Sequence, residues 1–482
     1  MTRRSSLIVP AATHRGILDH LFPGDGDEHG LIIAAGVHKL DGTMRLLARE
    51  VFLAKDGIDY VAGRHGYRML KAEFIHPVIR HCRKHRLAYL AVHNHGGSDR
   101  VAFSPDDLES HERGYPALLD LAEGMPVGGL VYAPRAIAGD IWMPDGSRLA
   151  LEEARILGAN IEHWFDSPRN GSNLTDDSGI HARQLLMFGS AGQARLREAR
   201  VGVIGAGGSG SLIVEYLAHL GVGRIVLADD DRIALSNLSR VVGATRWDAR
   251  WPFSREEMPR AIREWAGRHA ARKIDIARRL IKRAAPACAV DIHFADFSRA
   301  DICTKFLGCD FLFLAADSMR ARLVFNAIVN QYFIPGIQVG SKIVPSEAAG
   351  TLDDVFSVER WVLPRTNCLW CSGMISPQGL ALEAKSPEER RQQDYGTQQP
   401  NPSVITVNAV GAAHAVNDFL MSYLGLYKEQ VVPRPRRFRH GTRELIVEEY
   451  PPDPECTECG PDPGSRFGRG DAVALPATGA VR

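Results

Sequence analysis

The sequence has almost no charge imbalance and no long apolar run, and each shortage excludes a class of protein. Its 58 Lys and Arg residues nearly balance 57 Asp and Glu residues, giving a formal net charge of +1 at pH 7. This balance argues against general attraction to nucleic acid or to an anionic membrane. No segment reaches the roughly 20 apolar residues that span a bilayer, and the first residues lack the form of a signal peptide. We therefore expect a cytoplasmic protein with no membrane and no nucleic-acid partner.

Cysteine is scarce, and its placement is informative. Eight cysteines in 482 residues do not suggest a disulfide scaffold. Four of them form two CxxC pairs, which supply the four thiolates of a closed structural zinc site. Redox thiols are the alternative, but one pair ends the folded region, where no thioredoxin-like βαβ pattern surrounds it. The pairs are Cys368 with Cys371 and Cys456 with Cys459, and the core thiols are Cys82, Cys288, Cys303 and Cys309.

The chain is long enough for two or three domains, because one hydrophobic core seldom serves 482 residues. We predict an α/β protein with a mixed N-terminal domain over 1–154, a polar linker over 155–178, a nucleotide-binding domain over 179–460 and a disordered tail over 461–482. In the first domain the apolar patterns predict strands over 31–34, 44–52 and 87–92 and a helix over 72–85.

A glycine turn lies between an apolar strand at 201–204 and a helical pattern at 212–220. Such a turn leaves room for phosphate against bare amides at a helix N-terminus. The next strand, 224–228, runs into carboxylates where a doubly wound fold places its ribose ligand. Alone, the motif is also typical of dehydrogenases and of a structural turn. Its residues are Gly205, Gly207, Gly208 and Gly210, followed by Asp229 and Asp231.

Further motifs stand in order around this turn. They are Arg183 with Gln184, Gln193 in AGQ, Ser236, Asn237 and Arg240 in SNLSR, Lys273, and Asp317 after the apolar strand at 311–315. The ordered set resembles the ThiF/MoeB family and the adenylation domain of ubiquitin-activating enzymes over nearly all of residues 180–460. A dehydrogenase has no reason to carry this set. The resemblance implies a Rossmann-like, doubly wound and mostly parallel sheet.

The resemblance also implies a reaction in which a carboxylate attacks the α-phosphorus of ATP and pyrophosphate leaves. Arg240 and Lys273 would neutralise the phosphates, and Asp317 would hold Mg²⁺. Asp229 would bind the ribose, and Arg183 would reach across a homodimer interface into the partner's site. An insertion over 247–269 lengthens the connection that precedes the lysine. Gly205, Gly207, Gly208, Gly210, Asp231, Ser236 and Asn237 complete the expected nucleotide site.

One feature of ubiquitin-activating enzymes is missing. They carry a nucleophilic cysteine beyond the first CxxC pair, whereas this chain has none between Cys371 and Cys456. We therefore expect an acyl-adenylate that passes directly to another protein or to a sulfur donor. ThiF/MoeB proteins hold zinc with cysteine pairs in these places, which agrees with the structural zinc site predicted above.

A second constellation lies in the first domain, in HNHGGSDRVAFSPDD. On a strand that continues through His95, His93 and His95 point to one face. Ser104 and Pro105 are typical of a helix start, which puts Asp107 in the first turn. Three protein ligands plus water describe a catalytic zinc site. The alternative is a capped helix beside surface histidines.

The spacing of this constellation resembles the JAB/JAMM zinc metallopeptidases, whose motif is HxHP, seven residues, then SxxD. Gly96 stands where that family usually has proline, and no ligand is lost. The family also needs an upstream glutamate as general base and acid, for which Glu28 is the best match and Asp27 the fallback. Ser104 would stabilise the oxyanion. The resemblance covers about the first 150 residues and implies a JAB/MPN-like fold.

Together the two resemblances imply a fused enzyme that needs ATP, Mg²⁺ and two Zn²⁺ ions, one catalytic and one structural. The adenylation domain would activate the C-terminal carboxylate of a ubiquitin-like or sulfur-carrier protein ending in glycine, and the peptidase or isopeptidase would trim or remove the same partner. Two alternatives stay open: a silent docking domain, or adenylation of a small acid or peptide C-terminus. The sequence does not identify the partner or the acceptor of the activated carboxylate. It also leaves open whether the peptidase matures the partner or deconjugates it, and whether the pathway is cofactor synthesis or bacterial defence.

Overall fold

The computed structural model describes residues 4–40, 42–61, 69–168, 179–346, 350–385 and 402–479. The chain divides into two compact units. Unit 1 comprises Met1–Asn170, Asn330–Phe333 and Gly460–Ala474, and unit 2 comprises Gly171–Val329, Ile334–Cys459 and Leu475–Arg482. Among the described residues, no helix combines the length and apolar character needed to cross a bilayer.

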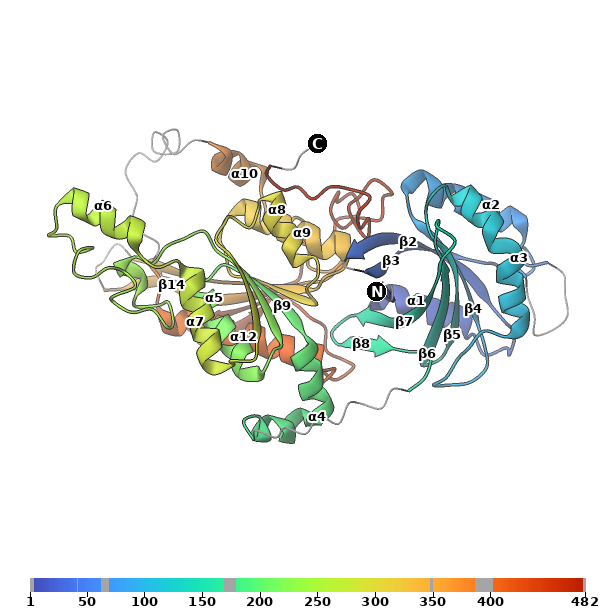
Figure 1. Ribbon diagram of the computed structural model, residues 1–482, viewed down its shortest axis with the longest axis horizontal. Helices are drawn as coiled ribbons and strands as arrows, with labels where there is room; N and C mark the ends of the chain where they lie inside the picture. The colour runs from blue at the N-terminus through green and yellow to red at the C-terminus, as the bar shows by residue number, and fades with distance from the viewer. Residues whose placement is uncertain are drawn as a thin grey trace. The chain divides into compact units, whose positions relative to one another are not determined.

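Unit 1 is built on an eight-stranded sheet in the order β1-β3-β2-β4-β5-β6-β7-β8, and β1 also pairs with β7, so the sheet closes on itself (Figure 1). The strands are β1 (Arg4–Pro10), β2 (Gly30–Leu40), β3 (Thr43–Leu53), β4 (Ala88–Asn94), β5 (Val127–Ala133), β6 (Ala136–Trp142), β7 (Arg148–Leu157) and β8 (Ile161–Trp164). The helices are α1 (Ala11–Leu21), α2 (Ala72–His85) and α3 (Pro105–Ala122).

The central strand β2 is apolar throughout because both of its faces are covered. Leu31 and Ile33 pack into the cluster that contains Ile17 of α1. Ile32 and Ala34 point to the opposite face, where they pack with residues of α2 and α3. A strand buried on both faces has a continuous apolar pattern rather than an alternating one.

The predicted elements of unit 1 are present, but its limits differ from the prediction. The expected strands lie in β2, β3 and β4, and the expected helix is α2. The apolar patterns do not predict β1, α1 or β5 to β8. The predicted linker over 155–178 is wrong in its first part, because residues 155–164 finish β7 and form β8. The polar side chains there belong to a sheet edge; residues 169–178 lie outside the described residues.

The predicted disordered tail from residue 461 is also wrong for most of its length, because Gly460–Ala474 folds as part of unit 1. Arg49 is 2% exposed and donates hydrogen bonds to the carbonyl oxygens of Asp462 at 2.8 Å and Ser465 at 3.3 Å. Phe467 is fully buried. A buried guanidinium needs several acceptors, and backbone carbonyls of an irregular segment supply them despite its Gly- and Pro-rich composition.

Unit 2 contains a second eight-stranded sheet with helices around it (Figure 1). Its strands are β9 (Arg200–Ile204), β10 (Arg224–Ala228), β11 (Ala289–His293), β12 (Phe311–Leu314), β13 (Gly336–Pro345), β14 (Leu352–Val362), β15 (Arg436–Arg439) and β16 (Glu444–Val447). Its helices are α4 (Ala182–Glu198), α5 (Gly208–Leu220), α6 (Arg260–His269), α7 (Lys273–Ala284), α8 (Ala300–Cys303), α9 (Met319–Tyr332), α10 (Pro377–Ala384) and α12 (Ile405–Tyr423), with short 3-10 turns at Leu235–Asn237 and Thr304–Phe306.

The sheet of unit 2 is parallel in one half and antiparallel in the other. Strands β11, β10, β9, β12 and β13 pair in parallel, in that order. The pairings of β13 with β14, of β14 with β15 and of β15 with β16 are antiparallel. Chain order reverses beside β9, since β10 and β11 lie on one side and β12 and β13 on the other. Open α/β sheets bind ligands at such a switch point, beyond the carboxyl ends of the strands.

Candidate functional site

The glycine turn lies at this switch point, between β9 and α5. Gly205 has φ +95°, and its amide donates to the carbonyl of Ala228 at 2.8 Å. A Cβ at Gly210 would lie 1.9 Å from the carbonyl oxygen of Gly205. Both positions therefore require glycine, one for its backbone conformation and one for close packing. Gly207 is the N-cap of α5 without a side-chain cap, so the first amides of the helix remain available to an anion.

Asp229 and Asp231 follow β10 beside the turn. One carboxylate oxygen of Asp229 accepts the amide of Ala206 at 2.7 Å, and the other accepts the amide of Asp231 at 2.8 Å. Burial raises the pKa of Asp229, against the effect of nearby Lys273. Lys273 Nζ lies 2.5 Å from Asp231 Oδ2. The structure thus brings together the two carboxylates and the lysine expected from the sequence, although 41 residues of chain separate Asp231 from Lys273.

Arg240 also lies beside the glycine turn. Its NH1 donates to the carbonyl of Ser236 at 2.8 Å, and its Cδ is 3.5 Å from the position of a Cβ at Gly208. Asn237 accepts the amide of Ala234 at 3.1 Å, which closes the short helical turn of this loop. The SNLSR segment therefore folds to hold one guanidinium against the start of α5.

Asp317 follows β12 at the same edge of the sheet. The carbonyl carbon of Ala315, two residues earlier, is 3.0 Å from the position of a Cβ at Gly205. Asp317 itself is exposed. Its place at the carboxyl end of a parallel strand agrees with the expected position of a ligand-binding carboxylate.

Gln184 and Gln193 of α4 form hydrogen bonds to the end of α5 that the sequence did not reveal. Gln184 Nε2 donates to the carbonyl of His219 at 2.9 Å, and Gln193 Nε2 donates to the carbonyl of Leu220 at 3.0 Å. Both carbonyls belong to the last turn of α5, whose oxygens have no partners within the helix. The motif residues therefore hold the far end of the helix that begins at the glycine turn. Arg183 is exposed in the first turn of α4.

Asn408 is a neighbour of the glycine turn that sequence reasoning missed. It lies in α12, is 3% exposed, and its Nδ2 is 2.4 Å from the position of a Cβ at Gly208. The two positions are 200 residues apart in sequence. No local pattern around 408 could have indicated this contact.

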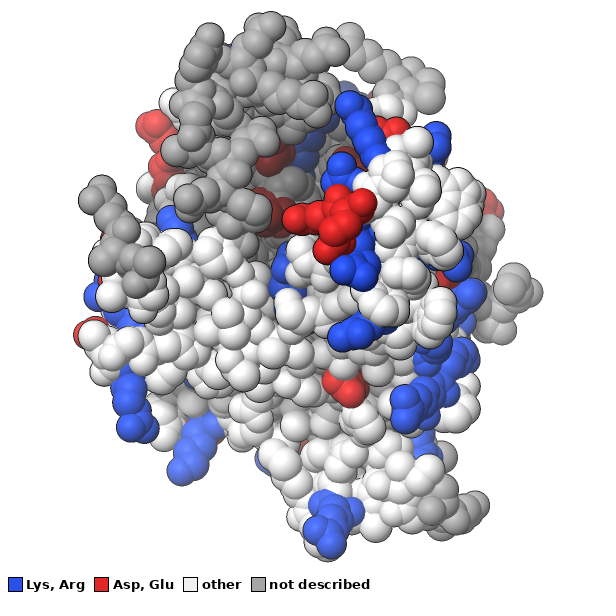
Figure 2. Space-filling view, turned by 90° about the vertical axis from the view of Figure 1, so that its left-hand side faces the viewer, with Lys and Arg blue, Asp and Glu red and all other residues white. Residues whose placement is uncertain are grey.

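The expected insertion between Arg240 and Lys273 forms loops and α6. Its bulky side chains are partly on the surface: Trp247 is 73% exposed and Trp265 is 44% exposed. Figure 2 views the molecule from the side on which α6 lies in Figure 1, and Lys and Arg side chains are spread over the described part of this face.

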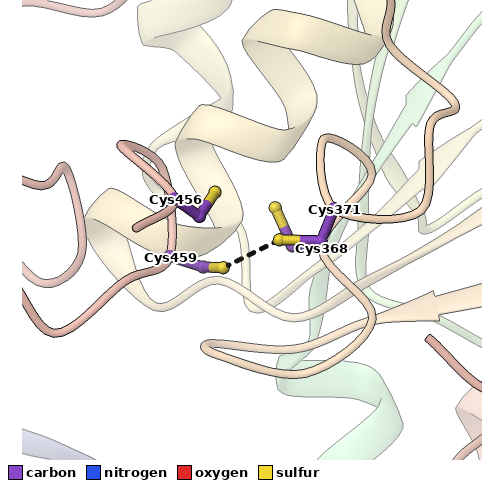
Figure 3. A group of neighbouring side chains, drawn as sticks. All are labelled: Cys368, Cys371, Cys456 and Cys459. Carbon is purple, nitrogen blue, oxygen red and sulfur yellow. Dashed lines mark hydrogen bonds between the residues drawn. The ribbon is translucent and has the colours of Figure 1, made fainter. Parts of the chain in front are cut away.

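The four CxxC cysteines meet, as Figure 3 shows, with one pair on each of two facing loops. Their sulfur atoms all lie within 4.8 Å of one another, and those of Cys371 and Cys459 are 3.5 Å apart. Tetrahedral zinc with bonds of about 2.3 Å sets its sulfur ligands about 3.8 Å apart. Cys368, Cys456 and Cys459 are buried, and the amide of Asp453 donates to Cys371 Sγ at 3.4 Å. These residues can hold one metal ion as a closed set.

In unit 1 the structure brings His93, His95 and Asp107 together. The two Nε2 atoms are 3.1 Å apart, and Asp107 oxygens lie 3.5 Å from that of His93 and 3.3 Å from that of His95. Three ligands of a tetrahedral zinc with bonds of about 2.0–2.1 Å are spaced about 3.3 Å apart. The carbonyl of Ala102 is 3.0 Å from His95 Nδ1, so that nitrogen carries the hydrogen and Nε2 presents its lone pair.

Helix α3 positions the carboxylate of this group. Ser104 is the N-cap of α3, as expected, and forms a capping box with Asp107, in which Ser104 Oγ also donates to Asp107 Oδ2 at 2.7 Å. Burial raises the pKa of Asp107, but hydrogen bonds from His93 and Ser104 outweigh it and leave the pKa well below its usual range. In the same helix His111 lies 3.0 Å from Asp140 of β6, which ties α3 to the sheet.

Glu28 precedes β2 and lies beside the same three side chains. Its Oε1 is 3.8 Å from His95 Nε2. The next residue anchors the segment: the amide of His29 donates to Asn94 Oδ1 at 2.6 Å, and its ring pairs with Asp25 at 3.0 Å. Sequence reasoning missed this support. Asp56 lies on the other side of the same ring, where its Oδ1 is 3.8 Å from His29 Nδ1.

Comparisons with known proteins agree with this geometry in unit 2. The adenylyltransferase and sulfurtransferase UBA4 of Yarrowia lipolytica is 48% identical over 81 residues, which are 15% of this chain and 20% of that protein. The SAMP-activating enzyme E1 of Haloferax volcanii is 47% identical over 64 residues, which are 13% of this chain and 24% of that protein. The sulfur carrier protein ThiS adenylyltransferase of Escherichia coli is 43% identical over 82 residues, which are 17% of this chain and 33% of that protein.

These alignments therefore span about a fifth to a third of the length of the curated relatives. A solved structure of E. coli MccB covers 60% of this chain and 76% of its own, with a TM-score of 0.45 and 17% identity. The model of the ThiF family matches residues 181–459, which is more than half of the chain and includes every expected residue of the nucleotide site and both cysteine pairs. The chain belongs to the ThiF family.

Proposed function

We propose that unit 2 adenylates the C-terminal carboxylate of a ubiquitin-like or sulfur-carrier protein with ATP. The observation that carries the proposal is the uncapped start of α5 at Gly207, with Arg240 beside Gly208 and Lys273 paired with Asp231 after β10. An anion-binding turn flanked by two cations suits a triphosphate. The names of the relatives support the class of substrate, since they include a SAMP-activating enzyme and a ThiS adenylyltransferase.

The charge of each side chain suggests its role in adenylation. The attacking carboxylate and the α-phosphate are both anions, so their approach requires neutralisation, which Arg240 and Lys273 supply. Asp317 is exposed at the strand end, where it can hold Mg²⁺, which would neutralise phosphate charge. Asp229 would bind the ribose hydroxyls, and Asp231 would hold Lys273 beside the site, with Ser236 and Asn237 in the neighbouring loop.

The activated carboxylate would leave without a thioester to this chain. No cysteine lies between Cys371 and Cys456. Burial raises the pKa of Cys82 to about 12 and that of Cys303 to about 11, so both stay protonated and inert near neutral pH. The acceptor is therefore another protein or a sulfur donor.

The functional assembly would be a homodimer in which Arg183 serves the partner's site. Arg183 is exposed on α4, and the same segment presents apolar side chains to solvent: Leu186 is 89% exposed and Met187 is 57% exposed. Apolar side chains at this exposure favour burial against another surface. An α4 interface would cover them and direct Arg183 away from its own chain.

The four cysteines would hold a structural Zn²⁺ ion that joins the chain near residue 370 to the segment near residue 457. Their sulfur spacing and burial support a closed tetrahedral site. Since the ligands come from distant parts of the chain, metal binding would stabilise the folded state directly.

Unit 1 would be a JAB/JAMM-type zinc peptidase or isopeptidase that trims or removes the same partner. His93, His95 and Asp107 would hold the catalytic Zn²⁺, which supplies an acidic bound water. Glu28, 3.8 Å from His95 Nε2, would take the proton from that water and return it to the departing amine. Ser104 would stabilise the oxyanion, for which its hydroxyl must turn from Asp107.

The test uses purified full chain, Mg²⁺, labelled pyrophosphate and a panel of ubiquitin-like proteins ending in glycine. Pyrophosphate exchange into ATP should appear with a cognate partner. Asp317→Ala should abolish the exchange and spare cleavage of a C-terminally extended partner, whereas His95→Ala should do the reverse. Exchange with a small acid or a peptide alone would favour the alternative substrate. Cleavage absent from every precursor would favour a silent docking domain.

A further inference from the structure

Helix α12 brings one buried carboxamide to the start of α5. The Nδ2 atom of Asn408 is 2.4 Å from where a Cβ of Gly208 would be, and Arg240 Cδ is 3.5 Å from that same point. Because glycine has no side chain here, the amide group of Asn408 lies directly against the backbone. Asn408 Nδ2 and Arg240 Cδ therefore both lie beside the backbone of Gly208 at the glycine turn.

Two serines hold this carboxamide in place. Ser341 of β13 donates its hydroxyl hydrogen to Asn408 Oδ1 at 2.6 Å, and Asn408 Nδ2 donates to Ser403 Oγ at 3.0 Å. A primary amide has two N–H donors. Among the described residues, Ser403 alone accepts from Nδ2, which leaves one N–H for a further acceptor. Asn408 is 3% exposed, so little water competes with an acceptor for that N–H.

We propose that Asn408 is a phosphate-binding residue, whose second N–H donates to a phosphate oxygen of the nucleotide bound at Gly208. This inference rests on the proposed function, because it requires a nucleotide at the glycine turn. The anion would receive backbone amides from the start of α5, the cation of Arg240, and a neutral donor from α12. Helix α12 packs against α5, β13 and β14, so nucleotide binding would also join the last helix of unit 2 to its phosphate turn.

Three variants of the full chain separate this role from simple packing. Asn408→Ala removes the donor. Asn408→Asp keeps the shape and can still accept hydrogen bonds from the hydroxyls of Ser341 and Ser403, but it places a carboxylate beside the phosphates. Ser341→Ala removes one anchor and keeps the donor. The probe is Mg²⁺-ATP, whose dissociation constant is measured by titration calorimetry without any protein partner.

We expect Asn408→Ala to weaken ATP binding about tenfold, as for a lost hydrogen bond to a charged group. Asn408→Asp should weaken it at least tenfold further, because two anions then face each other. Ser341→Ala should change it less than threefold. The thermal midpoint of each variant without ATP should stay near that of the wild type, which shows that folding is intact.

Other outcomes overturn the inference. Wild-type affinity in Asn408→Ala and Asn408→Asp would show that the carboxamide does not meet the phosphate. Equal losses in both variants, accompanied by a lower thermal midpoint without ATP, would assign Asn408 to packing. If the wild-type chain itself bound no Mg²⁺-ATP, the proposed function would fail as well, whereas wild-type binding with unchanged variants overturns the inference about Asn408 alone.

Discussion

Lys273 Nζ lies 2.5 Å from Asp231 Oδ2, and the lysine is 9% exposed although its helix is otherwise rich in solvated basic side chains. The ion pair keeps the cation at the nucleotide site rather than free in solvent. A charged lysine is seldom buried to this degree without a paired carboxylate.

Replacing Lys273 with alanine should therefore weaken Mg²⁺-ATP binding by about tenfold to a hundredfold, since a charge-assisted contact with phosphate is lost. Arg278→Ala is the matched control on the same helix, because Arg278 is exposed and pairs only loosely with Asp275, at 3.5 Å. Titration calorimetry measures both. Similar losses in the two variants would mean that general positive charge, and not this lysine, attracts the nucleotide.

The full chain should bind two Zn²⁺ ions per molecule. Cys459→Ser should lose one of them and lower the thermal midpoint, because a closed structural site contributes to folding. His95→Ala should lose the other and leave the midpoint nearly unchanged. Elemental analysis after gel filtration gives the counts. A single ion in the wild type, unaffected by His95→Ala, would contradict a metal site in unit 1.

Arg183 should act in trans. Arg183→Ala and Lys273→Ala should each be inactive in pyrophosphate exchange, but an equal mixture should recover about a quarter of the wild-type activity. The reason is that half of the mixed dimers are hybrids, and each hybrid contains one intact site. The two variants are mixed after mild dissociation and assayed with a cognate partner. No recovery from subunits that demonstrably exchange would place Arg183 in the site of its own chain.

The loss of stability at acid pH should depend in part on His14. Its ring is 5% exposed and packs edge-on against Trp164 with 4.5 Å between centroids. Burial lowers the pKa of His14 from 6.5 to about 4. His14 is therefore protonated below about pH 6.5 in the unfolded chain but only below about pH 4 in the folded protein. The free energy of unfolding should fall through this window as the pH falls, by up to about 3 kcal/mol.

His14→Phe keeps the ring and removes the titrating group. Urea unfolding near neutral pH and near pH 4.5 should show a smaller acid-induced loss in this variant than in the wild type. An equal loss in both proteins would show that other groups carry the acid sensitivity.

Much of the site was predictable because its chemistry depends on residues close together in sequence. The glycine turn between β9 and α5 and the helix start at Ser104 are local features, and each is present as predicted. The cysteine pairs also lie at the spacing that a metal loop needs, and the sulfurs do meet. Local spacing determines such features since a turn or a helix start involves only a few consecutive residues.

What the sequence alone determined was therefore the local motifs and the family model that residues 181–459 match. The tertiary structure alone decided the contacts between distant segments: Asn408 against Gly208, Gln193 at the end of α5, and the folded segment after Gly460. The physical reason is that a buried polar group takes whichever partner the packing brings to it. The partner's position in sequence plays no part in that choice.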